Sequence, residues 1–327
     1  MTEPQAIYRK DYQPSAYLIR TTELSFDLSE DETIVLSKVR YYQNPNSTCK
    51  ECSLFLNGVN LELVSISIDG VQPNYQLADE GLELSDLPDE FTLEVATRIH
   101  PEKNTSLNGL YQSSGNFCTQ CEAHGFRQIT YYLDRPDVLS VFTTHIKANP
   151  EYYPILLSNG NLINSKPGEV TWHDPSLKPC YLFALVAGDF AVLEDAYTTI
   201  SGNEVALKIY VESHNIDKTQ FAMDSLKRSF AWDEQRFGLE YDLDIYMIVA
   251  VDDFNMGAME NKGLNIFNST YVLANPDTAT DKDFINVEAV IGHEYFHNWT
   301  GNRVTCQDWI KNLLLICIHD RSSVLKM

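Results

Sequence analysis

The residues with the clearest chemistry lie near the end of the chain, in the stretch 290–299, which reads Val-Ile-Gly-His-Glu-Tyr-Phe-His-Asn-Trp. On a helix, His293 and His297 are separated by close to one turn, so both imidazoles project from one face. Two neutral imidazoles at this spacing can bind one zinc ion, and the carboxylate of Glu294 can then reach the attacking water. A single histidine on a helix is usually structural, but this five-residue pattern arises by chance in such a chain on the order of 1% of the time. The pattern therefore predicts a zinc hydrolase.

The residues before this pattern favour a helix. Asp281 and Asp283 place negative charge at its start, with Glu288 following, which suits the positive end of a helix dipole. Phe284, Val287 and Ile291 recur at spacings of three and four residues, and Gly301 can end the helix.

Composition limits the classes of partner. The chain has 327 residues, 24 Lys and Arg against 46 Asp and Glu, and a formal charge of −22. Such an acidic surface argues against binding to nucleic acid or to an anionic membrane and favours cationic ligands. The first ten residues lack an apolar segment of the signal-peptide type, and no run approaches the roughly 18 apolar residues of a membrane helix. We therefore expect a cytoplasmic protein and, without further signals, a monomer.

The seven cysteines include two Cys-x-x-Cys pairs, Cys49/Cys52 and Cys118/Cys121. A zinc ribbon usually separates its pairs by about 15–20 residues, whereas 65 residues lie between Cys52 and Cys118. We therefore interpret both pairs as reduced, ordinary thiols.

The remaining pattern predicts two domains. Residues 1–192 are rich in short alternating strands separated by turn signals, which predicts a β sandwich or a strongly curved, saddle-like sheet. Asn57-Gly58 predicts a hairpin, and Asp69-Gly70 predicts a second turn. From residue 193 to 309 strands alternate with helices, which predicts an α+β domain.

Four elements stand out in this second domain. The alternation in 205–211 predicts a strand, and the apolar run 245–251 predicts a buried one. Asp217, with Gln220 three residues later, resembles a capping box that opens a helix ending near Gly238. A loop that contains Asn and Gly follows the buried strand, and a further strand is expected at 264–267.

That loop, residues 253–262, reads Asp-Phe-Asn-Met-Gly-Ala-Met-Glu-Asn-Lys, and its Gly-Ala-Met-Glu-Asn segment ends 32 residues before His293. With both motifs in this order, the chain resembles the gluzincin zinc aminopeptidases from about residue 5 to Trp309. The segments Thr119–Glu122 and Ile129–Pro136 match that family as well. The resemblance implies a saddle-like β domain followed by a thermolysin-like catalytic domain.

The resemblance also implies roles for matching residues. His293 and His297 would bind one Zn²⁺ ion, with Glu294 as general base, and Glu260 would pair with the free α-ammonium of a peptide substrate. Further substrate-binding positions follow from the same match: Gln120 and Glu122 at the amine end of the cleft, Met256 in an apolar pocket, Gly257 and Ala258 along the peptide, and Met259 and Asn261 within the motif.

The family pattern stops near Trp309. Its third zinc ligand, a glutamate 19 residues after the second histidine, would fall at Ile316, and no glutamate follows Glu294. His319 and Asp320 could donate to a metal, but at a different spacing. The family's transition-state tyrosine and helical C-terminal region have no counterpart, so residues 310–327 are expected to be an atypical tail on a truncated domain.

Three alternatives remain open at this point. The chain could be a catalytically inactive fragment or pseudo-enzyme that lacks the third zinc ligand. It could be a relative of the epoxide hydrolases that share this scaffold, although the alanine at position 258 favours a peptidase. It could also be an endopeptidase, but Glu260 argues against that class because internal peptide bonds offer no ammonium group.

Overall fold

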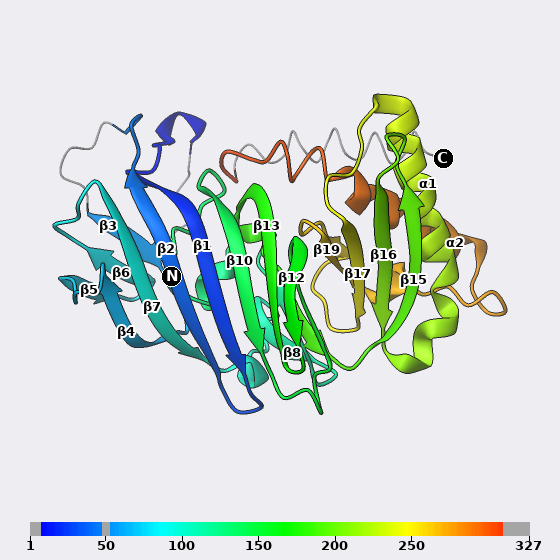
Figure 1. The fold of residues 1–327 in the computed structure, drawn as a ribbon, viewed down its shortest axis with the longest axis horizontal. Coiled ribbons are helices and arrows are strands. Elements are labelled where there is room, and N and C mark those ends of the chain that lie inside the picture. Colours follow the sequence, from blue (N-terminus) through cyan, green and yellow to red (C-terminus); the bar gives the residue numbers. More distant parts are fainter. Residues whose placement is uncertain (1–7, 48–52, 310–327) are drawn as a thin grey trace.

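The structure is a computed structural model that describes residues 8–47 and 53–309. Its first part is almost entirely β structure (Figure 1). The strands of this part are β1 (Tyr17–Leu28), β2 (Thr33–Gln43), β3 (Leu54–Asn57), β4 (Glu62–Ile68), β5 (Tyr75–Ala78), β6 (Gly81–Leu84), β7 (Glu90–Ile99), β8 (Gly109–Ser113), β9 (Asn116–Gln120), β10 (Leu139–Lys147), β11 (Ile155–Ser158), β12 (Asn161–Lys166), β13 (Glu169–Pro179) and β14 (Leu185–Gly188).

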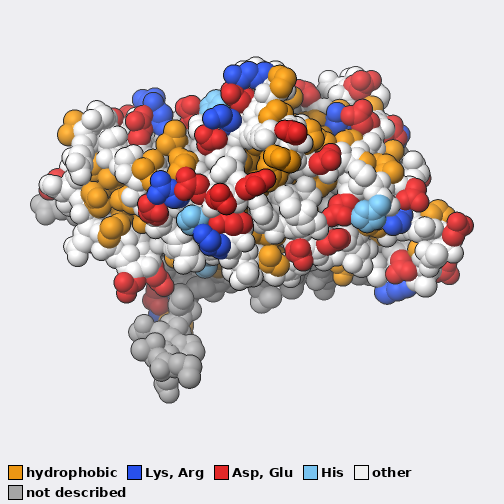
Figure 2. Space-filling view, turned by 90° about the horizontal axis from the view of Figure 1, so that it is seen from below, with side chains coloured by type: hydrophobic (Ala, Val, Ile, Leu, Met, Phe, Trp, Pro, Cys, Tyr) orange, Lys and Arg blue, Asp and Glu red, His pale blue; other side chains and the backbone are white. Residues whose placement is uncertain are grey.

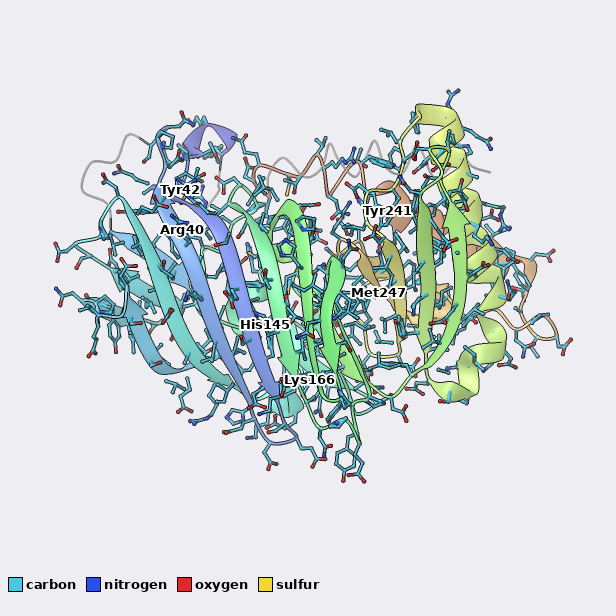
Figure 3. All side chains as sticks on the ribbon, viewed as in Figure 1. Arg40, Tyr42, His145, Lys166, Tyr241 and Met247 are labelled. Carbon is cyan, nitrogen blue, oxygen red and sulfur yellow. The ribbon has the colours of Figure 1, made fainter. Side chains whose placement is uncertain are left out.

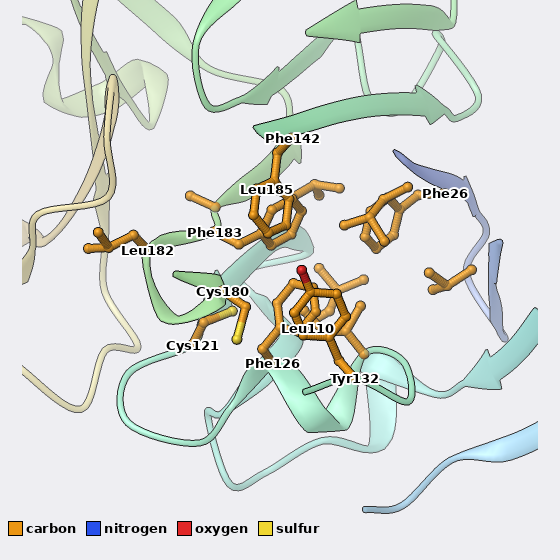
Figure 4. Close-up of a cluster of buried hydrophobic side chains, with 14 of the residues drawn as sticks. Phe26, Leu110, Cys121, Phe126, Tyr132, Phe142, Cys180, Leu182, Phe183 and Leu185 are labelled. Atoms are coloured by element: carbon orange, nitrogen blue, oxygen red, sulfur yellow. The ribbon is translucent and has the colours of Figure 1, made fainter. Parts of the chain in front are cut away.

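These strands form three sheets within the described residues. The largest has the order β12-β13-β10-β1-β2-β7-β4, and two smaller sheets have the orders β11-β14-β9-β8 and β3-β6-β5. Aromatic rings fill the space between them: Phe126 packs edge-on against Phe183 and Tyr132, with ring centroids 5.5 and 4.8 Å apart (Figure 4). The prediction of a β-rich first domain is confirmed.

The second part combines one sheet with two helices. Its elements are β15 (Ala191–Thr198), β16 (Glu204–Val211), α1 (Gln220–Phe237), β17 (Ile245–Val251), β18 (Ala258–Met259), β19 (Leu264–Asn268) and α2 (Asp281–Phe296), and the sheet order is β15-β16-β17-β19-β18. The two helices pack against each other, with the rings of Phe230 and Tyr295 4.3 Å apart. This arrangement confirms the predicted α+β architecture.

Strand β17 shows how the two parts join. Tyr246, Ile248 and Ala250 lie in the core shared with the helices, whereas Met247, Val249 and Val251 lie in the core shared with the first part. Because both faces of the strand are buried, its sequence is continuously apolar rather than alternating. Figure 3 shows Met247 on β17, between the first part and the helices. The sheet that contains β17 therefore packs against the first part with one face and against the helices with the other.

Two local predictions were wrong. Asn57-Gly58 makes no hairpin, because β3 pairs with β6 and β4 pairs with β7 in a different sheet. Asn57 instead bridges to Tyr132, and a Cβ on Gly58 would lie 2.3 Å from the ring of Tyr131. Close backbone approach, rather than turn geometry, explains this glycine.

The second wrong prediction concerns the start of α1. Residues 213–218 form a 3₁₀ turn, and Thr219 occupies the N-cap of α1 without a side-chain hydrogen bond to the helix end. The predicted end is confirmed, because Gly238 adopts a left-handed conformation after Phe237. The turn at Asp69-Gly70 is also confirmed by the pairing of Ile68 with Val71.

The surface fits the acidic composition. In the view of Figure 2, Asp and Glu side chains are spread over both parts of the molecule. Within the described residues, no helix has both the length and the apolar content needed to cross a membrane.

Candidate active site

Helix α2 places the two histidines side by side. Its N-terminus carries a capping box, in which the Thr280 hydroxyl accepts a hydrogen bond from the Asp283 backbone N–H and the Asp283 carboxylate accepts one from the Thr280 N–H. At its other end, the Nε2 atoms of His293 and His297 are 3.2 Å apart. Two nitrogens that each lie about 2.0–2.1 Å from one tetrahedral zinc ion are themselves about 3.3 Å apart. The spacing of the imidazoles therefore fits a shared zinc ion.

A hydrogen bond to the Thr300 backbone fixes the orientation of the His297 ring. Its Nδ1 lies 2.7 Å from the carbonyl oxygen of Thr300, so Nδ1–H donates and the lone pair of Nε2 faces His293. Burial lowers the pKa of His297 to about 4, so the ring is neutral at physiological pH. A neutral imidazole with a hydrogen-bonded outer nitrogen is the form that binds metals.

Glu294 lies beside these rings in a buried position. Its side chain is largely inaccessible, and Oε2 has no hydrogen-bond partner within the described structure. Burial raises the pKa of Glu294 well above its usual range, and the charges of Glu260 and Glu122 raise it further. A carboxyl group with this environment is suited to accept and return a proton.

The loop 253–262 brings Glu260 to the same place. Ala258 and Met259 form β18, which pairs with Phe267 and Ile266 of β19, and this pairing directs the next residue towards α2. Oε1 of Glu260 is 3.8 Å from Nδ1 of His297. Ligand atoms of Glu260, Glu294 and His297 lie within 4.8 Å of one another, as in a metal or cation site.

The first part supplies the opposite side of the site. Nε2 of Gln120, at the end of β9, donates to the sulfur of Met256 at 3.4 Å and to the carbonyl oxygen of Glu122 at 3.2 Å. Burial raises the pKa of Glu122, and the charge of Glu260 raises it further, so the two carboxylates interact electrostatically. Residues more than 130 positions apart in the sequence therefore meet here.

The remaining predicted substrate-binding residues lie in different environments. Asn261 is buried, and neither its side-chain oxygen nor its nitrogen has a partner within the described structure. Gly257 leaves room for the ring of Tyr271, which a Cβ would approach to 3.3 Å. The side chain of Met259 lies in the hydrophobic core, so a substrate role for this residue would have to involve its backbone. Ile316, His319 and Asp320 lie outside the described residues.

Several residues of the site escaped the sequence analysis. Asn302 donates from Nδ2 to the carbonyl oxygen of Glu260 at 3.1 Å, and its backbone N–H donates to the carbonyl oxygen of His297 at 2.9 Å. Burial raises the pKa of Tyr181, and the nearby Glu260 and Glu122 contribute to the rise. The turn-forming Thr300-Gly301-Asn302 after the histidines was a usable signal for Asn302, whereas Tyr181 carries none.

Comparisons with known proteins agree with this arrangement. Residues 20–182 match the peptidase M1 N-terminal domain, and residues 221–315 match the peptidase family M1 domain. The chain is 58% identical over 315 residues to aminopeptidase N of Escherichia coli (strain K12), covering 94% of this chain and 36% of that protein. It is 54% identical over 318 residues to aminopeptidase N of Haemophilus influenzae, with the same coverage of 94% and 36%.

A solved structure is similar over the same range. The crystal structure of Legionella pneumophila aminopeptidase A in complex with aspartic acid has a TM-score of 0.92 and 36% sequence identity, covering 97% of this chain and 38% of that one. The chain thus spans a little over a third of the length of these relatives. Both domains of one family match in order along the chain, and we conclude that it belongs to peptidase family M1.

Proposed function

We propose that this site is that of a zinc-dependent aminopeptidase, which removes single residues from peptides with a free N-terminus. The observation that carries the proposal is the position of Glu260, whose Oε1 is 3.8 Å from Nδ1 of His297 and whose charge raises the pKa of Glu122 in the first part. Carboxylates beside the histidines, in addition to the proposed base Glu294, are suited to bind a cationic group through charge-assisted hydrogen bonds.

The histidines and Glu294 account for the hydrolytic step. When bound by His293 and His297, zinc supplies a Lewis acid that polarises the scissile carbonyl. Glu294 accepts the proton of the attacking water on a carboxylate oxygen and donates it to the nitrogen of the leaving amine. Its raised pKa suits both transfers.

The buried carboxylates account for the exopeptidase preference. Burial raises the pKa of both Glu122 and Glu260, and the charge of Glu260 raises that of Glu122 further, so an α-ammonium placed between them would relieve this cost through charge-assisted hydrogen bonds. Gln120 has an unpartnered, buried Oε1 that can accept a third hydrogen bond from the same group. The scissile bond then lies one residue from the amine.

One specific observation favours a second candidate, an inactive chain. The position at which the family carries its third zinc ligand holds Ile316, whose side chain cannot bind a metal. Catalytic zinc sites normally use three protein ligands and one water, so two histidines would hold the ion weakly. An epoxide hydrolase activity is the third candidate, supported only by the shared scaffold.

A panel of substrates tests these candidates. The chain is loaded with zinc and given alanyl anilide, its N-acetylated form and a small epoxide, with Glu294→Gln as the control for adventitious hydrolysis. An aminopeptidase hydrolyses the free anilide and loses nearly all activity when the amine is acetylated. Equal turnover of the blocked substrate would overturn the proposal, and zinc loading without any turnover would favour the inactive chain.

A further inference from the structure

The site depends on the relative position of two separate elements, the loop 253–262 and the turn 300–304. Glu260 belongs to the loop, and the turn follows the histidines of α2. Asn302 joins them, because its side chain donates to the carbonyl oxygen of Glu260 and its backbone N–H donates to the carbonyl oxygen of His297. Asn302 holds the backbone of Glu260 through a single neutral hydrogen bond, and such a bond typically contributes only about 1 kcal/mol to stability.

A third element adds charge to this connection. Asp242 lies between α1 and β17, and its carboxylate contacts Lys262 through Oδ1 and Arg303 through Oδ2, the latter at 2.9 Å. Lys262 follows Glu260 by two residues, and Arg303 follows Asn302 directly. One carboxylate therefore holds a cation from each of the two elements that form the site.

The two halves of this bridge differ in burial. The side chain of Lys262 is 3% exposed, whereas that of Arg303 is 49% exposed. The ammonium of Lys262 also lies 5.3 Å from the centre of the Tyr241 ring. Because an exposed ion pair contributes little, most of the connection runs through Lys262.

The loop is also fixed to the first part on both sides of Glu260. Asn159 donates from Nδ2 to the carbonyl oxygen of Lys262 at 2.9 Å. On the other side, the hydroxyls of Ser113 and Tyr111 donate to the carboxylate and the carbonyl oxygen of Asp253, both at 2.9 Å. The loop is therefore anchored to the first part at Asp253 and at Lys262.

The charge of Asp242 is itself held in place. Burial alone would raise the pKa of this carboxyl, but the charges and hydrogen bonds of Lys262 and Arg303 outweigh burial and lower it. The bridge is therefore ionised across the physiological range.

We propose that Asp242 is a positioning residue, which fixes the separation of Glu260 and His297 by holding Lys262 and Arg303 on one carboxylate. It acts on the loop through Lys262 and on the turn through Arg303. The proposed amine recognition supplies the functional meaning of this role, so that part rests on the proposed function.

The test uses the whole chain without added metal and compares Asp242→Asn with Asp244→Asn. Asp244 lies on the same connection, is exposed, and accepts a hydrogen bond from Asn161 at 2.8 Å, and within the described residues its carboxylate forms no ion pair with Lys262 or Arg303. Hydrogen–deuterium exchange is followed in peptides that cover 254–263 and 299–304, with β1 and β16 as internal references. Asp242→Asn should speed exchange in the two site segments about tenfold and leave β1 and β16 unchanged, whereas Asp244→Asn should leave the site segments unchanged.

Lys262→Met distinguishes a specific bridge from general loosening. If Asp242 acts through Lys262, this variant should reproduce the local change, and the double variant should add little to it. Additive effects, or unchanged exchange in 254–263, would overturn the proposal.

A second readout concerns the amine. Binding of L-alaninamide and N-acetyl-L-alaninamide is measured by nuclear magnetic resonance titration, and Asp242→Asn should reduce the preference for the free amine about tenfold while Asp244→Asn keeps it. Loss of the bridge with an unchanged preference would contradict the positioning role. If the unaltered chain shows no preference for the free amine, the proposed function fails, and the exchange measurements still decide whether Asp242 holds the loop.

Discussion

Replacing Glu260 by glutamine in the metal-free chain tests the electrostatic account of the site. Glu260 is 9% exposed, and burial raises its pKa to about 7. Its charge also raises the proton affinity of Glu294 and Glu122. The ionised carboxylate is therefore a cost to the folded state when no cation is bound.

The sign and size of the effect follow from linkage. A carboxyl whose pKa rises on folding binds its proton more tightly in the folded state, so its contribution to stability is complete below its unfolded pKa and is lost as the pH rises through its folded pKa. A rise from 4.5 to about 7 corresponds to about 3 kcal/mol at about 1.36 kcal/mol per pKa unit. Glutamine cannot ionise, so Glu260→Gln should gain about 3 kcal/mol on the unaltered chain between about pH 5 and about pH 8.

Urea unfolding of chelator-treated protein measures this difference at several pH values. The control is Glu288→Gln. The carboxylate of Glu288, on α2, pairs with Arg228 of α1 at the surface, and the two side chains are 50% and 49% exposed, respectively. That variant should differ from the unaltered chain by less than about 1 kcal/mol at each pH. If Glu260→Gln showed the same difference at both ends of the range, or were the less stable protein at high pH, the account of this site would be wrong.

Three further predictions follow from single features. Lys178→Met should lower the free energy of unfolding by about 3–5 kcal/mol, because it leaves the buried carboxylate of Asp174 without its ion-pair partner, which lies 3.0 Å away. The double variant Lys178→Met/Asp174→Leu should recover most of this loss in the same urea experiment. Thr280→Ala should cost about 1 kcal/mol in urea unfolding, because it removes the hydroxyl of the α2 capping box. In equilibrium dialysis with zinc, His297→Ala should lose bound metal that Glu294→Gln retains, and equal losses would make Glu294 a ligand rather than a base.

Periodicity predicted those elements whose burial follows a simple rule. Strand β17 has the predicted bounds because both of its faces are covered, which leaves an uninterrupted apolar run between polar residues. The turn at Asn57-Gly58 failed because the same dipeptide serves a different purpose, the close approach of Gly58 to Tyr131. Local sequence cannot distinguish a glycine that is needed for a turn from one that is needed because another side chain packs against its backbone.

The residues of the candidate site likewise include some that local spacing identifies and some that come together only through tertiary packing. Spacing along one helix identified His293, Glu294 and His297, because all three lie within a single turn. The contact between Gln120 and Met256 joins residues 136 positions apart and depends on how β9 packs against the loop. Family resemblance predicted those residues, but the sequence carried no sign of Asp242, whose importance lies in two partners from different elements.

Several buried polar atoms at the site have no hydrogen-bond partner within the described structure, and this has a thermodynamic consequence. They include Oε1 of Gln120, Oε2 of Glu294, Oδ1 of Asn302 and both polar side-chain atoms of Asn261. Other buried hydroxyls are paired, as in the contacts of Thr22 with Tyr132 and Ser140. Each unpartnered buried group costs about 1–3 kcal/mol, so the site opposes folding while the surrounding core favours it. A cation that binds only the folded chain removes part of this cost and adds its own binding free energy to stability. The proposed recognition of a substrate amine would therefore be coupled to the stability of the fold through the same carboxylates, Glu122 and Glu260.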